Sequence, residues 1–231
     1  MFYKNAKVFC GDFSFHHGAF EVVDGKFGQV MPDDVPEDAV DLQGATVIPG
    51  LIDVHSHGNS GADFSDGDYE GLQTMAAYYA SVGVTSFAPA SMTLPYETLE
   101  KAYANAKRLV EETPAGLSVL RGIQMEGPYF SYKKRGAQNP DYLKEPDFEG
   151  FKALQDSCGG LIRIVDVAPE LPGAEEFVRQ AKELCTVSVA HTDADYDHAK
   201  AAFDAGATHL THLYNAMPAI HHRNPGVIPA A

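Results

Sequence analysis

The pattern of hydrophobic positions divides the chain into two regions. Up to about residue 45, short runs such as Phe2–Phe9 and 18–23 read as strands that are broken by Gly- and Asp-containing turns, which is typical of short β-strands. From Thr46 onward, short apolar runs alternate with longer amphipathic segments. The pattern therefore predicts a small β domain over residues 1–45 and an α/β domain over residues 46–231.

The second region contains six apolar runs that we predict as strands, and five amphipathic segments that we predict as helices. The strands are 46–54, 83–89, 117–125, 161–167, 187–190 and 207–211, and the helices are 69–81, 95–111, 147–157, 173–184 and 194–205. Such repeats build parallel sheets, and about six βα units in a row favour an incomplete (β/α)8 TIM barrel. A doubly wound open sheet is the alternative, although no glycine fingerprint of a dinucleotide fold follows the first strand.

The ends of the predicted strands carry the side chains that indicate chemistry. His55 and His57 end the first strand, and side chains two residues apart in a strand point to the same face. Glu126, His191 and His212 end the third, fifth and sixth strands. Because the catalytic groups of such barrels lie at the carboxyl ends of the strands, we expect these five residues on one rim.

Imidazole and carboxylate groups in this combination are ligands of zinc or iron. Five ligands are too many for one tetrahedral ion with an open position, and they fit two divalent cations bridged by Glu126. Burial of a carboxylate is costly unless it is paired or bound to a metal. The sequence therefore predicts a site for two ions and leaves their identity, zinc or iron, open.

Three motifs resemble those of the N-acetylglucosamine-6-phosphate deacetylase family of the amidohydrolase superfamily, in the same order and spacing. They are residues 50–58, which contain His55 and His57, the Met-Glu-Gly-Pro run at 125–128, and the His-Leu-Tyr-Asn-Ala-Met run at 212–217. The resemblance implies a metal-dependent (β/α)8 barrel with a small β-sandwich, which would occupy residues 1–45. It also implies hydrolysis of the acetamide of N-acetylglucosamine 6-phosphate to glucosamine 6-phosphate and acetate. Since some members lack the His-x-His pair and hold one metal, this chain resembles the two-metal members.

The resemblance also implies which residues bind the substrate. Asn215 and Ala216 lie in the motif that meets the sugar phosphate in the family, and Arg223 matches its phosphate-binding arginine; a planar guanidinium suits bidentate phosphate binding. Ala137 and Gln138 lie in the substrate loop. Many members carry His at the position of Gln138, and Gln can hydrogen-bond an acetamide or a hydroxyl but cannot carry charge.

The family's general base is an Asp at the end of the eighth strand. Since only six strands are predicted up to Ala231, we expect this Asp beyond Ala231, no catalytic residue within the chain, and little turnover from what resembles a truncated deacetylase. Two alternatives stay open. One is another amidohydrolase, acting on a cyclic amide or a dipeptide, and the other is a non-catalytic metal-binding remnant.

Composition narrows the function mainly by exclusion. A formal charge of −15 disfavours nucleic acid, which needs clustered Lys and Arg. No run approaches the ~20 apolar residues of a membrane span, the N-terminus lacks the apolar core of a signal peptide, and the three cysteines show no CxxC spacing. We expect a cytoplasmic enzyme with neither nucleic acid nor membrane as a partner. The resemblance implies a homodimer that acts on a small amino-sugar phosphate.

Overall fold

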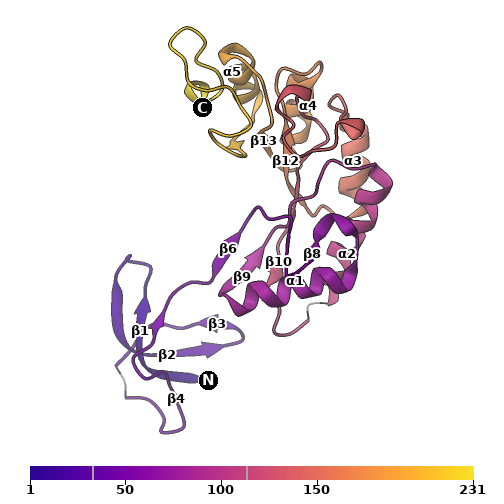
Figure 1. The fold of residues 1–231 in the computed structure, drawn as a ribbon. Coiled ribbons are helices and arrows are strands. Elements are labelled where there is room, and N and C mark those ends of the chain that lie inside the picture. Colours follow the sequence, from indigo (N-terminus) through magenta and orange to yellow (C-terminus); the bar gives the residue numbers. More distant parts are fainter. Residues whose placement is uncertain (33, 113) are drawn as a thin grey trace. The chain divides into compact units, whose positions relative to one another are not determined.

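The computed structural model describes residues 1–32, 34–112 and 114–231. The chain forms two compact units, Met1–Gly50 and Leu51–Ala231, and each is described by itself (Figure 1). We propose residues 1–45 and 46–231 as the two functional domains.

The first unit is a sheet of short strands with a small core. Its strand order is β3-β2-β1-β4, and β5 also pairs with β1. Strands β1 and β2 form an antiparallel hairpin whose inward positions, Ala6, Val8 and Phe20, make the core. The strands are β1 (Phe2–Phe9), β2 (Phe15–Val23), β3 (Lys26–Phe27), β4 (Val40–Asp41) and β5 (Thr46–Val47).

The second unit is built on parallel strands that follow one another in chain order. They pair as β10-β9-β6 and β11-β12-β13-β14, and a parallel bridge between Ala90 and Gln124 joins the two sets. A doubly wound sheet would reverse its strand order at a switch point, so the sequential order confirms the barrel type. The strands are β6 (Leu51–Asp53), β9 (Val84–Phe87), β10 (Val119–Leu120), β11 (Ile123–Met125), β12 (Ile162–Val167), β13 (Thr186–Val189) and β14 (His209–Leu210), and a small hairpin adds β7 (Gly58–Asn59) and β8 (Ala62–Asp63).

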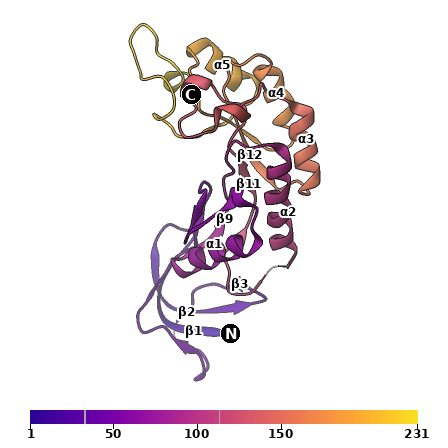
Figure 2. The ribbon, with the colours of Figure 1, turned by 45° about the vertical axis from the view of Figure 1, so that its right-hand side comes forward.

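Helices separate these strands, and each helix contacts the next one along the chain. Helices α2, α3 and α4 follow one another along one side of the strands (Figures 1 and 2). Asp68, Asp147 and Asp195 accept a backbone N–H at the first turns of α1, α3 and α5, and such N-caps fix where a helix begins. The helices are α1 (Tyr69–Ser81), α2 (Tyr96–Glu112), α3 (Phe148–Ser157), α4 (Ala174–Ala181) and α5 (Tyr196–Ala205).

The prediction of one buried strand over 46–54 is wrong. The segment forms two short strands, β5 and β6, which belong to different units, and Pro49 lies between them. Proline cannot donate a ladder hydrogen bond and is therefore disfavoured inside a continuous strand. The apolar side chains are not buried either, since Leu51 is 54% and Ile52 is 69% exposed.

The predicted strand 117–125 is also divided, into β10 and β11, with Arg121 and Gly122 between them. A Cβ at Gly122 would lie 2.2 Å from Cγ of Arg163, so the backbone passes close to the side chain of the neighbouring strand. Strand β11 pairs with β12, and Glu126 follows directly after its last residue.

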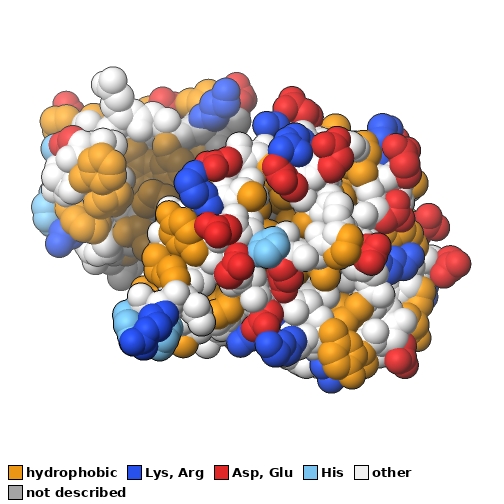
Figure 3. Space-filling model, turned by 90° about the horizontal axis from the view of Figure 1, so that it is seen from above, with side chains coloured by type: hydrophobic (Ala, Val, Ile, Leu, Met, Phe, Trp, Pro, Cys, Tyr) orange, Lys and Arg blue, Asp and Glu red, His pale blue; other side chains and the backbone are white. Residues whose placement is uncertain are grey.

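The surface agrees with the acidic composition. On the face drawn in Figure 3, acidic and basic side chains are interspersed with apolar ones. Among the described residues, no helix is both long and apolar enough to cross a membrane.

Candidate metal centre

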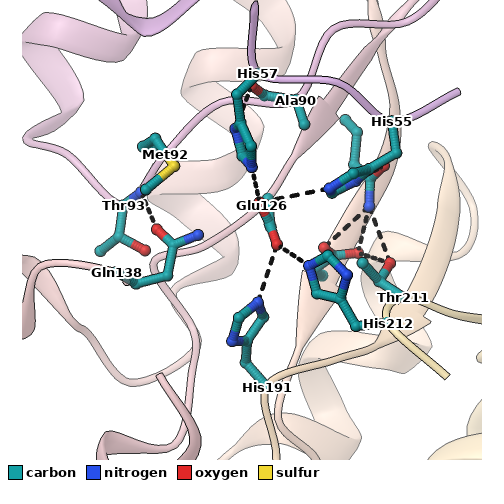
Figure 4. A network of polar contacts seen from close by, with 12 residues as sticks. His55, His57, Ala90, Met92, Thr93, Glu126, Gln138, His191, Thr211 and His212 are labelled. Atoms are coloured by element: carbon teal, nitrogen blue, oxygen red, sulfur yellow. Dashed lines mark hydrogen bonds and ion pairs between the residues drawn. The ribbon is translucent and has the colours of Figure 1, made fainter. Parts of the chain in front are cut away.

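Four strand ends bring all five predicted ligands together (Figure 4). His55 and His57 follow β6, Glu126 follows β11 directly, and His191 and His212 come shortly after β13 and β14. Parallel strands that run in chain order place their carboxyl ends at one edge of the sheet. We call these five residues the Glu126 cluster.

Glu126 lies at the centre of the cluster and is 1% exposed. Its Oε1 lies 2.9 Å from His191 Nε2 and 2.6 Å from His212 Nε2. Its Oε2 lies 2.9 Å from His57 Nε2 and 3.9 Å from His55 Nε2. Each carboxylate oxygen therefore faces one pair of imidazoles, which is the arrangement that a carboxylate bridging two cations requires.

Backbone carbonyls hold two of the imidazoles from behind. His57 Nδ1 lies 3.1 Å from the carbonyl oxygen of Ala90, and His191 Nδ1 lies 2.9 Å from that of Lys134. Because a carbonyl oxygen only accepts, Nδ1 donates in both cases, so loss of the second ring proton leaves the lone pair on Nε2, toward Glu126. Metal-binding histidines are usually held in this way.

The backbone around the cluster has unusual conformations. His191 and His212 have positive φ angles of 45° and 59°, a left-handed conformation that is uncommon outside glycine and clusters at functional sites. Gly127, with φ of +93°, leaves no room for a side chain, since a Cβ there would lie 2.1 Å from Thr93 Oγ1. These unusual backbone conformations lie at His191 and His212 and directly after Glu126, three of the five predicted ligands.

The imidazoles change the protonation of Glu126, and Glu126 changes theirs. Burial acts to raise the pKa of Glu126, but hydrogen bonds from His191, His212 and His57 outweigh it and hold that pKa far below its ordinary value. The hydrogen bond to Glu126 in turn raises the pKa of His57 and of His212. In the metal-free protein the carboxylate thus faces imidazoles that favour their charged form, and metal binding must release those protons.

The residues of the cluster fit a divalent cation. One ligand atom each of His55, Glu126 and His212 lie within 4.8 Å of one another. Glu126 is 1% exposed and faces imidazoles at both of its oxygens, and a buried carboxylate is costly unless it is paired or bound to a metal. A His and Glu group that can hold a metal is typical of amidohydrolases.

Among the predicted substrate residues, Gln138 lies at the cluster. It is 4% exposed, and its Oε1 accepts a hydrogen bond of 2.7 Å from the backbone N–H of Thr93. Its amide nitrogen points toward the side where Glu126 lies (Figure 4).

The other predicted substrate residues lie in loops. The carbonyl oxygen of Ala216 accepts a 3.0 Å hydrogen bond from the N–H of Thr192, which ties the loop after β14 to the loop after β13. Ala137, Asn215 and Arg223 are exposed. In the described part of the chain, no hydrogen bond or ion pair holds the Arg223 guanidinium.

Sequence reasoning missed Gln124 and Asp166, two buried polar residues beside the cluster. Burial, and after it the negative charge of Glu126, raises the pKa of Asp166 to about 8. Both left a signal in the sequence. Gln124 lies two residues before Glu126 on the same strand, and Asp166 interrupts the apolar run of β12.

Comparison with known proteins agrees with this geometry. A model of the amidohydrolase family matches residues 46–228, and the chain belongs to that family.

Within the family, the chain is similar to N-acetylglucosamine-6-phosphate deacetylases. It is 41% identical to the Bacillus subtilis (strain 168) enzyme over 190 residues, which are 81% of this chain and 48% of that protein. The crystal structure of the Mycobacterium smegmatis enzyme matches with a TM-score of 0.89 and 31% identity, over 100% of this chain and 60% of that one. A mutant of the same enzyme, solved in complex with N-acetyl-D-glucosamine-6-phosphate, matches with a TM-score of 0.88 and 31% identity, over the same shares. The chain spans about half the length of the curated relatives it matches.

Proposed function

We propose that this protein hydrolyses the acetamide of N-acetylglucosamine 6-phosphate to glucosamine 6-phosphate and acetate, using two divalent cations, zinc or iron. The observation that supports the proposal most is the division of the Glu126 cluster into two imidazole pairs, one on each carboxylate oxygen. The similarity to deacetylases of this substrate supports the choice of reaction.

In this proposal the five ligands have distinct roles. His55 and His57 would hold one cation, His191 and His212 would hold the other, and Glu126 would contribute to both. Bound cations of this kind lower the pKa of a water molecule and polarise a carbonyl group. The Nδ1 hydrogen bonds to Ala90 and Lys134 keep Nε2 of two rings directed at the site.

Substrate positioning falls to the loops around the cluster. Oε1 of Gln138 already accepts a hydrogen bond from the backbone N–H of Thr93. The NH2 group of Gln138 can therefore donate to an acetamide or hydroxyl oxygen of the sugar. Arg223 would pair with the phosphate and Asn215, Ala216 and Ala137 would meet the sugar phosphate or its loop. The resemblance further supports a cytoplasmic homodimer with an Asp as general base at the end of an eighth strand.

The test combines substrate binding and acetate release. The zinc-loaded 231-residue chain should bind N-acetylglucosamine 6-phosphate more tightly than N-acetylglucosamine, and a chelator should weaken the binding of both sugars. Acetate release from N-acetylglucosamine 6-phosphate should depend on the bound metal and should stop when the chelator is added. Equal affinity for both sugars, or preference for a cyclic amide or an acetylated dipeptide, would contradict the proposal.

A further inference from the structure

A buried polar network lies behind His55. Asp166 and Gln124 are 0% and 1% exposed, and Thr211 follows β14. Gln124 Nε2 lies 3.2 Å from Asp166 Oδ1 and 3.0 Å from Oδ2, and Thr211 Oγ1 lies 2.9 Å from Oδ1. On its other side, Gln124 Oε1 lies 2.8 Å from His55 Nδ1. Hydrogen bonds thus lead from the buried carboxyl group of Asp166, through Gln124, to the ring of His55.

The chemistry of these groups fixes the direction of each hydrogen bond. Above its raised pKa, Asp166 is a carboxylate that only accepts, so the Gln124 atom that faces it is the NH2 group. The remaining amide atom, Oε1, also only accepts, and His55 must donate to it from Nδ1. A neutral imidazole has a single N–H, so Nε2 of His55 keeps its lone pair, 3.9 Å from Glu126 Oε2.

The hydroxyl groups agree with this direction. Thr211 Oγ1 lies 2.9 Å from Gln124 Nε2 and must accept there, which leaves its own hydrogen for Asp166. Ser188 Oγ lies 2.8 Å from Thr211 Oγ1 and can donate to it. Within the described residues, every hydrogen bond to Asp166 therefore comes from an N–H or O–H group, as an ionised carboxylate requires.

We infer that Asp166 is a positioning residue for the metal site: through the amide of Gln124 it keeps the proton of His55 on Nδ1 and leaves Nε2 free to bind a cation. The inference rests on the proposed metal site. Hydrogen bonds of this kind set the tautomer and the basicity of metal-bound imidazoles. If Asp166 only filled the interior of the sheet, its replacement would leave the tautomer of His55 unchanged.

The variant Asp166→Asn separates these roles while keeping the shape of the side chain. Gln124 Nε2 lies within 3.2 Å of both Asp166 oxygens, so either orientation of the introduced amide places an NH2 group against another NH2 group. Rotation of the Gln124 amide by about 180° relieves this clash, because it exchanges the positions of the NH2 group and Oε1. The Gln124 NH2 group then faces His55, which must accept at Nδ1 and carry its proton on Nε2.

The direct readout is NMR of the histidine ring nitrogens in metal-free protein, with the His55 signals assigned by their loss in His55→Gln. At about pH 9, free imidazole is neutral and the medium is above the raised pKa of Asp166. We expect the Nδ1–H tautomer in the wild type and in Asp204→Asn, an exposed control on α5, and the Nε2–H tautomer in Asp166→Asn. The Nε2–H tautomer in the wild type, or no change in Asp166→Asn, would overturn the inference.

Zinc titration gives an independent readout. Asp166→Asn should weaken one of the two zinc sites about 10- to 100-fold, and Asp204→Asn should leave both unchanged. Combining Asp166→Asn with Gln124→Glu should restore affinity and tautomer, because the introduced carboxylate accepts the His55 proton directly while the introduced amide donates to it. Failure of this rescue would count against the inference.

The outcomes distinguish the inference from the proposed function. If the wild-type chain bound no zinc, the proposed function would fail, but the tautomer of His55 would still be measured in the metal-free protein. If Asp166→Asn did not fold, the wild-type tautomer and the double variant would decide.

Discussion

The Glu126 cluster and the segment 213–223 come from the same unit and differ in how they are held. Each member of the cluster lies at or just beyond a strand end, and Glu126 is 1% exposed. In the segment that follows, Asn215 and Arg223 are exposed. Ala216 is tied back through Thr192, and Met217 is buried in the core and accepts a hydrogen bond from Lys134 Nζ. The comparison shows that the metal ligands are fixed by the sheet, whereas the proposed phosphate ligands depend on loops.

The largest expected effect is on metal binding by Glu126→Gln. The variant keeps the shape of the side chain but removes the charge that bridges the two imidazole pairs. Zinc affinity should fall more than about 100-fold, beyond the usual effect of a residue that only supports a ligand. Isothermal titration of Glu111→Gln, an exposed control on α2, should match the wild type. Tight binding of two zinc ions by Glu126→Gln would show that the Glu126 cluster is not the metal site.

The next effect is a pH dependence of stability caused by Asp166. Burial raises its pKa from 3.8 to about 8, so between these values the folded protein holds a proton that the unfolded chain has lost. This contribution to stability is complete below pH 3.8 and is lost as the pH rises through about 8, with a limiting slope of about −1.4 kcal/mol per pH unit. Urea unfolding of metal-free Asp166→Asn should lack this slope. Parallel pH profiles for variant and wild type would contradict the assignment.

A smaller effect is expected at Gln138, between the cluster and the loops. Gln138→Ala removes the acceptor of the Thr93 N–H, which is buried, and should lower the free energy of unfolding by about 1–3 kcal/mol. If this variant melted at the same temperature as the wild type, the hydrogen bond to Thr93 would not stabilise the loop that contains Gln138.

The smallest effect on stability is expected for Arg223→Ala. Exposed substitutions without a partner usually change stability by less than about 0.5 kcal/mol, and zinc affinity should not change. Affinity for N-acetylglucosamine 6-phosphate should nevertheless fall relative to N-acetylglucosamine, while Arg179→Ala, an exposed control on α4, keeps the wild-type ratio. Equal losses of affinity for both sugars would contradict the assignment of Arg223 to phosphate binding.

The same difference explains how much could be predicted from the sequence. The five residues of the cluster were predictable because parallel strands share an edge, so a polar residue at each strand end has a known place. The prediction of a buried strand over 46–54 is wrong because apolar side chains can remain exposed, as Leu51 and Ile52 do, and because proline disfavours a continuous strand. Asp166 and Gln124 were missed because their contact depends on the register between β11 and β12, which no single strand reveals.

The residues proposed to bind the sugar phosphate could be suggested only by resemblance. Arg223 lies in a loop without the period of a strand or a helix, so the sequence pattern gives its side chain no direction. The exposure of Arg223 in the structure agrees with that lack of constraint.

The most direct test of the central claim is an anomalous scattering map of zinc-loaded crystals. The account predicts two peaks flanking Glu126, one about 2.0–2.1 Å from Nε2 of His55 and His57 and the other equally close to Nε2 of His191 and His212. A single peak, or peaks only away from Glu126, would contradict it.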